Sequence, residues 1–348
     1  MRVIGLVAAL AAMLCAHASR AEILVGGDDP ACKAAVALSD ARRGAELLVL
    51  RNGKPICEAY SGEGAPDQRM GIWSGTKPLV GMMMAAAVQD GLLTLDEKVA
   101  ATLPEWRADP RKSRATLRHL LTLSAGLGGQ PATEYAEAVA LPLQTEPGEV
   151  FAYGGPSLLV FGEVMKRKLA AAGQPADPYL YVRRRLLDPL GLGGATWERT
   201  PGGDPQMALG VTLTAREWAR FGEFVRAGGV VNGKPLVDPD TFRQLFVSSA
   251  ANPEYGVTWW LPHPPRVMDP ISASTDIGLE AGKLPPDLVM STGIGDQRLY
   301  VIPSRHLTIV RLGSYSVAWA MEHRGKLRPP PWPDTEFLLL LLRTASGE

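Results

Sequence analysis

Residues 71–91, GIWSGTKPLVGMMMAAAVQDG, contain the feature that most limits how this chain can fold. From about residue 74 to residue 90 the apolar side chains run almost all the way round a helix. A helix of that kind has to be buried on every side, so the rest of the chain must enclose it. Yet the helix begins with two polar residues three positions apart, Ser74 and Lys77. A buried lysine is costly unless it has a task.

The spacing of Ser74 and Lys77 suits a nucleophilic serine with a lysine base. Side chains three apart on a helix are neighbours, with Cβ atoms about 5–6 Å apart. At a helix start the free N–H groups and the positive end of the dipole favour negative charge. A desolvated lysine can lose its proton and then activate a serine hydroxyl. The alternative is a serine cap followed by a surface lysine, and these two residues alone do not decide between them.

Motifs for other kinds of catalysis are absent from the sequence. It contains no G-x-S-x-G, no H-E-x-x-H, no EF-hand pattern and no glycine-rich nucleotide-binding motif. His119 lies in an apolar helical run, where a role in the core is expected, and the other histidines lack metal-ligand spacing. We therefore expect no metal or other cofactor.

The first 21 residues have the pattern of a secretory signal peptide. Arg2 precedes a short apolar run, and small residues end the segment at Ala18 and Ala21. The run is too short to span a bilayer, so we expect no integral membrane segment in the mature chain, residues 22–348. The expected location is the periplasm or the extracellular medium.

Two cysteines, Cys32 and Cys57, remain after this segment. In an oxidising compartment they can pair, which would stabilise the fold by roughly 3 kcal/mol. Two separate buried thiols are the alternative. Neither cysteine belongs to a C-x-x-C motif, so a disulfide-exchange function is not indicated.

Charge and length describe an ordinary globular chain. Its 348 residues include 36 basic and 36 acidic side chains, and no block of like charge stands out. This balance argues against nucleic acid as a partner. The oligomeric state stays open.

Strand patterns lie at both ends of the chain and helical patterns fill the middle. Asn52-Gly53 between two apolar runs predicts a hairpin, and Asn232-Gly233 predicts a second turn. The expected strands are 46–51, 54–60, 255–261, 287–291, 297–303 and 307–313, and the expected helices are 30–45, 74–90, 115–129, 156–173, 214–229 and 335–345, the last after a polyproline-like connector, 328–334. This order predicts an α+β fold, with an antiparallel sheet flanked by helices in a body of about 22–110 and 285–348. An all-helical lobe, about 111–284, is inserted between them.

Several segments together resemble a known family. Ser74-Gly75-Thr76-Lys77 is similar to its first motif, and FAYGGPSLLVFGEV, residues 151–164, resembles the segment with its second motif, a tyrosine two residues before an asparagine. ATLRHLLTLSAGL and YGVTWWL also have counterparts, and STGIGDQRLYVIPSRHLTIVRLG resembles the third-motif strand with the following hairpin. Over most of residues 30–315 the chain resembles the serine β-lactamase-related family, which contains class C β-lactamases, DD-peptidases and related esterases and amide hydrolases.

The resemblance implies roles for further residues. Tyr153 would lie near Ser74 and Lys77 and move a proton between the serine and the leaving group. The backbone N–H groups of Ser74 and Ile294 would form the oxyanion hole. The implied set for the oxyanion hole and substrate binding comprises Ser74, Ser291, Thr292, Gly293 and Ile294.

Two departures from the family pattern bear on the substrate. Gly155 stands where the asparagine is expected, and Ser291 stands where relatives often have lysine or histidine. The chain thus lacks a side chain that orients an amide and a cation that attracts a substrate carboxylate. Arg298 is a nearby cation that could replace the second. Ser291→Lys, or Gly155→Asn with it, is expected to improve lactam turnover.

These observations predict a secreted serine hydrolase that forms an acyl-enzyme on Ser74 without a cofactor. Its expected substrates are small-molecule esters, then small amides or β-lactams, with weak β-lactamase and DD-peptidase activity. The alternative is a non-catalytic relative that binds a cell-wall or peptide ligand. The two departures favour the alternative, whereas the joint presence of Ser74, Lys77 and Tyr153 favours the enzyme.

Overall fold

The computed structural model describes residues 21–266, 275–314 and 331–343. The expected signal peptide, except its last residue, lies outside these ranges, as do the first three residues of the proline-rich connector. Within the described ranges, no helix has both the length and the hydropathy needed to cross a bilayer.

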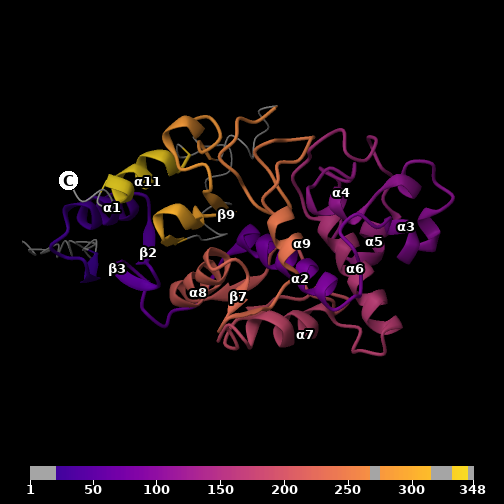
Figure 1. The fold of residues 1–348 in the computed structure, drawn as a ribbon, viewed down its shortest axis with the longest axis horizontal. Coiled ribbons are helices and arrows are strands. Elements are labelled where there is room, and N and C mark those ends of the chain that lie inside the picture. The colour runs from indigo at the N-terminus through magenta and orange to yellow at the C-terminus, as the bar shows by residue number, and fades with distance from the viewer. Residues whose placement is uncertain (1–20, 267–274, 315–330, 344–348) are drawn as a thin grey trace, which may run out of the picture.

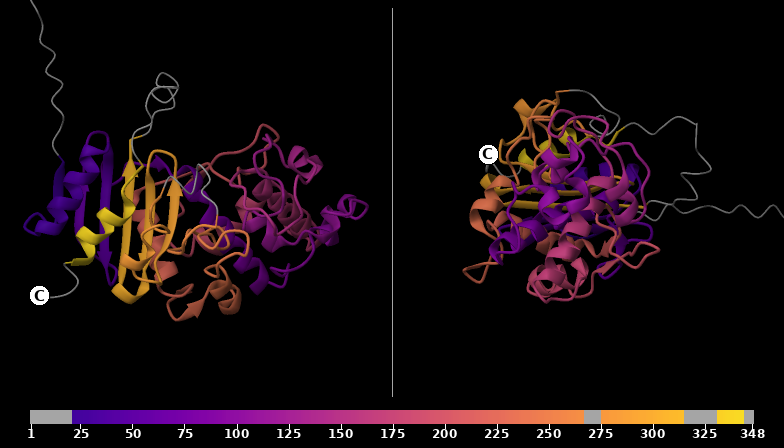
Figure 2. Two further views of the ribbon diagram at one scale, coloured as in Figure 1. Left: turned by 90° about the horizontal axis from the view of Figure 1, so that it is seen from above. Right: turned by 90° about the vertical axis from the view of Figure 1, so that its right-hand side faces the viewer.

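A six-stranded antiparallel sheet joins the two ends of the chain, as predicted. Its strand order is β1-β3-β2-β11-β10-β9. The central pair, β2 and β11, runs in register from Arg51 opposite Leu307 to Glu46 opposite Leu312. Figure 2 shows these strands side by side, with strands from both chain ends in one sheet. The strands are β1 Glu22–Val25, β2 Gly44–Arg51, β3 Lys54–Tyr60, β9 Val289–Gly293, β10 Gln297–Ile302 and β11 Leu307–Gly313.

The two predicted Asn-Gly turns are confirmed. Asn52 and Gly53 both have left-handed backbone angles, φ +51° and +75°, as a two-residue hairpin turn requires. Asn232 and Gly233 do the same between β7 Val230–Val231 and β8 Lys234–Pro235. A separate three-stranded sheet, order β4-β6-β5, consists of Met70–Gly71, Val211–Leu213 and Thr196–Trp197.

Helices cover both faces of the large sheet. α1 and α11 lie on one face and α8 on the other (Figure 1), where α8 contacts β2, β10 and β11. Phe337 of α11 packs on the ring of Tyr300 on β10, with the two ring centroids 6.0 Å apart. The predicted packing of a terminal helix on the sheet is therefore confirmed. The helices are α1 Pro30–Ala41, α2 Lys77–Gln89, α3 Val99–Thr102, α4 Leu117–Leu121, α5 Tyr135–Ala140, α6 Pro156–Ala171, α7 Pro178–Val182, α8 Ala215–Arg226, α9 Pro239–Gln244 and α11 Asp334–Arg343.

The apolar helix of the sequence, α2, lies between the sheet body and the helices α3 to α6 (Figure 1). Every residue from 77 to 87 is buried, as its composition predicts. Gly81 has no space for a side chain, because an added Cβ would lie 2.3 Å from Oγ1 of Thr258. The loop that carries Thr258 therefore packs directly on the helix backbone.

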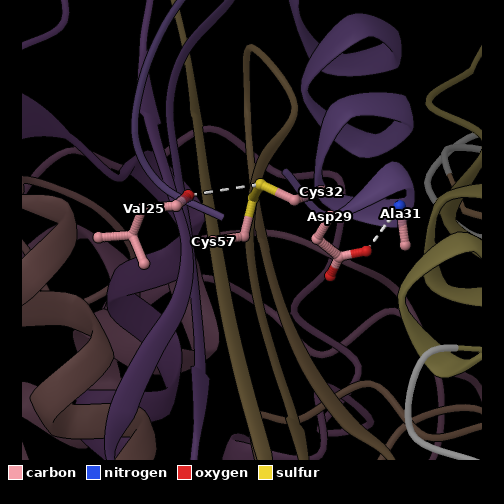
Figure 3. The surroundings of a disulfide bond; sticks show 5 residues. All are labelled: Val25, Asp29, Ala31, Cys32 and Cys57. Atoms are coloured by element: carbon pink, nitrogen blue, oxygen red, sulfur yellow. Dashed lines mark hydrogen bonds between the residues drawn. A yellow bond between two sulfur atoms is a disulfide. The ribbon is translucent and has the colours of Figure 1, made fainter. Parts of the chain in front are cut away.

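The disulfide that the sequence allowed is present (Figure 3). Cys32, in the first turn of α1, is bonded to Cys57 on β3, 25 residues further along the chain. The carbonyl oxygen of Val25 lies 3.6 Å from the sulfur of Cys32, and Asp29 caps α1 by accepting a hydrogen bond from the N–H of Ala31. The disulfide fixes α1 to the sheet.

Two predicted elements differ from the structure. Residues 255–261 form no strand but only isolated bridges, because Thr258 is left-handed, φ +67°, and its N–H donates to the carbonyl of Leu121 instead of a strand. The helix expected over 115–129 ends at Leu121, well before its glycines. Leu123 takes a left-handed conformation, φ +54°, which breaks the helix.

The segment 111–284 is not purely helical, contrary to the expected lobe. It contains β5 to β8, and its helix α8 packs on the large sheet. An added Cβ on Gly222 of α8 would lie 2.4 Å from Cγ2 of Thr308, so helix and sheet are in close contact. Thr214 is the N-cap of α8 and forms a capping box with Glu217, so the helix starts where the sequence predicted.

Candidate active site

Ser74 lies in a 3₁₀ turn, Trp73–Thr76, that runs directly into α2. The turn is held by β6, since the N–H of Ile72 donates to the carbonyl of Val211 over 2.9 Å and the N–H of Val211 donates to Oγ1 of Thr76 over 3.1 Å. Trp73 has a left-handed backbone, φ +52°, a conformation that costs of order 1–3 kcal/mol in a non-glycine residue. We call residues 72–77 the nucleophile turn.

Lys77 is the first residue of α2, and its side chain points at Ser74. Its Nζ lies 2.9 Å from Oγ of Ser74 and 2.9 Å from the carbonyl oxygen of Ala208. The side chain is buried, with 3% of the residue exposed, and burial lowers the pKa of Lys77 to about 7. The amine therefore exchanges protons near neutral pH while in contact with the serine hydroxyl.

The ring of Tyr153, the residue that the resemblance places near Ser74 and Lys77, lies beside Lys77. Lys77 Nζ is 4.6 Å from the centroid of the Tyr153 ring. The ring stacks on Trp260, at 5.8 Å between centroids, and meets the edge of Tyr255 at 6.2 Å. Phe151 completes this group, with its centroid 5.2 Å from that of Tyr255. The aromatic side chains hold the Tyr153 ring against the lysine.

Strand β9 passes directly beside the nucleophile turn. An added Cβ on Gly293 would lie 2.0 Å from the carbonyl oxygen of Ile72, so only glycine permits this approach. Ser291 and Thr292 are buried within the strand. Ile294 follows the last residue of β9 and is 50% exposed, so it lies at the surface next to the turn. The four residues that the resemblance assigned to substrate binding thus lie on, or directly after, the edge strand that passes beside the nucleophile turn.

Arg298 does not replace the missing cation, which corrects that expectation. It lies on β10, is almost fully buried, and pairs with Asp334 of α11, with Nε 2.7 Å from Oδ1. The same carboxylate accepts a hydrogen bond from the hydroxyl of Tyr300. Burial raises the pKa of Asp334, and Arg298 opposes this rise. The guanidinium is thus committed to fixing the terminal helix on the sheet.

Gly155 is the N-cap of α6 and lies next to Ala208, the residue whose carbonyl oxygen accepts a hydrogen bond from Lys77. Its backbone is right-handed, φ −89°, and an added Cβ would lie 3.6 Å from Cβ of Ala208, an ordinary contact. A side chain at this position would therefore begin in contact with Ala208. Glycine here is not required by the backbone.

Sequence reasoning missed two contributions to the site. The carbonyl of Ala208 leaves no trace in the sequence, because every residue has one. Trp260 was expected in a strand, and nothing in its local pattern indicated that it supports Tyr153. His119 was expected in the core but is only half-buried, and it takes part in the capping box that starts α4: its Nδ1 accepts a hydrogen bond from the N–H of Thr116. In the described ranges, no group of three or more His, Cys, Asp or Glu side chains is arranged to hold a metal ion.

Comparisons with known proteins identify a matching family and chains of similar fold. The profile of the family described as Beta-lactamase matches residues 29–318. A crystal structure of a penicillin-binding protein homolog from Caulobacter crescentus is 16% identical to this chain, with 93% of this chain and 100% of the other covered and a TM-score of 0.68. EstCE1, described as a hydrolase with promiscuous acyltransferase activity, is 17% identical, with 91% and 98% covered and a TM-score of 0.63. An uncharacterized protein of Alkalihalophilus pseudofirmus is 23% identical over an alignment 305 residues long, which covers 77% of this chain and 83% of that protein. At these identities the structural likeness shows a shared fold.

Proposed function

Because the chain belongs to the beta-lactamase family of serine hydrolases, we propose that it hydrolyses small neutral esters through an acyl-enzyme on Ser74. One observation carries the proposal: Lys77 Nζ lies 2.9 Å from Oγ of Ser74, and burial lowers the pKa of this lysine to about 7. A lysine with an ordinary pKa would be protonated at neutral pH and could not take the serine proton.

The first half of the reaction acylates the serine. Neutral Lys77 takes the hydroxyl proton of Ser74 as Oγ bonds to the ester carbonyl carbon. The tetrahedral intermediate then collapses, the bond from carbon to the alkoxy oxygen breaks, and the alcohol leaves with a proton passed on from Lys77 through Tyr153. This role of Tyr153 is the one that the family resemblance implies, and its ring centroid lies 4.6 Å from Lys77 Nζ.

The second half returns the enzyme to its starting state. A water molecule gives a proton to the same base and attacks the acyl carbon. The carboxylic acid leaves as the bond to Ser74 Oγ breaks, and the serine regains its proton. We assign the oxyanion hole to the backbone N–H groups of Ser74 and Ile294, where such a donor pair often supplies the largest single catalytic contribution. The close approach of Gly293 to Ile72, which brings these two backbone segments together, supports the assignment.

The preference for esters over lactams and D-Ala-D-Ala peptides is also a proposal. Those two substrate classes carry a carboxylate, and in this chain Arg298 is committed to Asp334 while Ser291 is uncharged. A charge-assisted hydrogen bond contributes about 1.5–3 kcal/mol, so its loss lowers turnover about tenfold to a hundredfold. An ester has the better leaving group and tolerates the absence of an orienting side chain at Gly155.

We further propose that the protein is exported to the periplasm or the medium. The signal pattern of residues 1–21 suggests this, and the Cys32–Cys57 disulfide supports it, because disulfides persist mainly in oxidising compartments. Fractionation of the native host, with the N-terminus of the purified protein sequenced, tests both the location and the cleavage.

A labelling experiment tests the catalytic proposal. A fluorophosphonate probe should modify the wild-type protein at Ser74, and Ser74→Ala should abolish both labelling and hydrolysis of nitrophenyl esters. The substrate panel should include short- and long-chain nitrophenyl esters, a chromogenic cephalosporin, a D-Ala-D-Ala peptide and a linear amide dimer. An unlabelled wild type that turns over none of them, yet binds a cell-wall peptide, would instead support a non-catalytic binding protein. Efficient cephalosporin hydrolysis would refute the ester preference.

A further inference from the structure

Ser291 stands where the resemblance places a cationic side chain, yet its hydroxyl contacts the protein itself. Its Oγ donates a hydrogen bond to the carbonyl oxygen of Gly75 over 3.2 Å. Only 1% of the residue is exposed. Gly75 directly follows Ser74, so this bond joins β9 to the peptide next to the nucleophile.

A second contact joins β9 to the other side of the nucleophile. Gly293, two residues after Ser291 on the same strand, approaches the carbonyl of Ile72 so closely that an added Cβ would lie 2.0 Å from its oxygen. β9 therefore touches the chain both before and after Ser74, through Ile72 and Gly75.

The opposite side of the nucleophile turn is held by the segment 208–211. Val211 exchanges hydrogen bonds with Ile72 and Thr76, and the carbonyl of Ala208 accepts one from Lys77. Beneath the turn there is no free space, since an added Cβ on Gly75 would lie 2.8 Å from the indole of Trp218. The turn is thus clamped between β9 and residues 208–211, and Ser291 supplies the side-chain hydrogen bond from β9.

We propose that Ser291 is a positioning residue, whose hydroxyl fixes the Gly75 peptide and so keeps Oγ of Ser74 at hydrogen-bonding distance from Lys77. This inference rests on the proposed function, because it concerns the same serine. It also changes the expectation for Ser291→Lys. That variant loses the bond to Gly75 and adds an ammonium inside the clamp, so it lowers ester turnover rather than creating a useful carboxylate site.

The test compares Ser291→Ala with a matched control, Ser39→Ala. Both remove a buried serine hydroxyl with one hydrogen-bond partner, but Ser39 bonds Nε of Arg311 and belongs to α1. We expect Ser291→Ala to lower kcat for a neutral nitrophenyl ester about twofold to tenfold, the range for one neutral hydrogen bond. KM should stay unchanged, and the fluorophosphonate labelling rate should fall by the same factor. Ser39→Ala should keep wild-type kcat, and Ser291→Thr, which retains the hydroxyl, should recover most of it.

The outcomes separate this inference from the proposed function. If wild type is labelled and Ser291→Ala has the same kcat and labelling rate, with only a lower melting temperature, the hydroxyl is merely structural and the inference is overturned. A raised KM with unchanged kcat would make Ser291 a substrate-binding group, which also overturns it. An unlabelled wild type would refute the proposed function, and the inference with it. Melting curves of all variants, with kinetics measured well below each transition, exclude unfolding as the cause of lost activity.

Discussion

The pH dependence of ester hydrolysis gives the sharpest test of Lys77 as the base. The lysine acts only when neutral, so kcat/KM should rise with pH through the pKa of about 7 that burial gives it. At that pKa about half of the molecules carry the neutral amine at pH 7, and about 1% do at pH 5. At the ordinary pKa of 10.5 the neutral fraction at pH 7 would be only about 0.03%.

These fractions fix the size of the effect. Between pH 5 and pH 8 the neutral fraction rises from about 1% to about 90%, so kcat/KM should increase about 90-fold. The assay is nitrophenyl ester hydrolysis followed at a wavelength where absorbance does not depend on product ionisation. The rate of fluorophosphonate labelling over the same pH range provides an independent readout, because it depends on the same deprotonation of Ser74.

Lys77→Met is the matched variant, since methionine is similar in length and suits a buried site. It should lose about 10²–10⁴-fold in kcat/KM, the usual contribution of a positioned base, and the rise with pH should disappear with it. A flat wild-type profile between pH 5 and pH 8, or one that keeps rising toward pH 10, would refute the assignment of Lys77. Circular dichroism at each pH verifies that the protein stays folded over the range used.

Three further predictions concern stability and specificity. Burial raises the pKa of Glu46 from 4.5 to about 8, so between these pH values the folded state keeps a proton that the unfolded state has released, and the free energy of unfolding should fall as pH rises from about 4.5 to 8. Urea titrations should show this fall in wild type and its loss in Glu46→Gln. A Glu46→Gln variant that is less stable than wild type at pH 8 would contradict the reasoning. Replacing Cys32 and Cys57 by serine should lower the free energy of unfolding by about 3 kcal/mol and leave ester kcat unchanged, since the disulfide joins α1 to β3. A double variant with the melting temperature of wild type would contradict a stabilising role of the disulfide. Gly155→Asn should fold normally and raise the ratio of amide to ester turnover, because the asparagine side chain would begin beside Ala208, whose carbonyl oxygen binds Lys77. A ratio equal to that of wild type would show that the missing asparagine does not limit amide hydrolysis.

The features that the sequence by itself determined are those whose causes lie within one turn or one hairpin. The apolar composition of residues 77–87 requires burial wherever the helix packs, and the structure buries all of them. Asn52-Gly53 selects a two-residue turn because both residues tolerate left-handed backbone angles. Ser74 and Lys77 are brought together by the local geometry of the turn, so their contact needed no knowledge of the rest of the fold.

Only the tertiary structure decided which distant groups meet. Cys32 and Cys57 could each have stayed a buried thiol, and their pairing depends on where α1 packs on the sheet. Arg298 finds Asp334 through the docking of the terminal helix, which removes it from the active site. Two contacts of the site use backbone carbonyl oxygens: that of Gly75 accepts a hydrogen bond from the hydroxyl of Ser291, and that of Ala208 accepts one from Lys77. Carbonyl groups are the same in every residue, so their use in a site depends on where the chain passes and cannot be read from residue types.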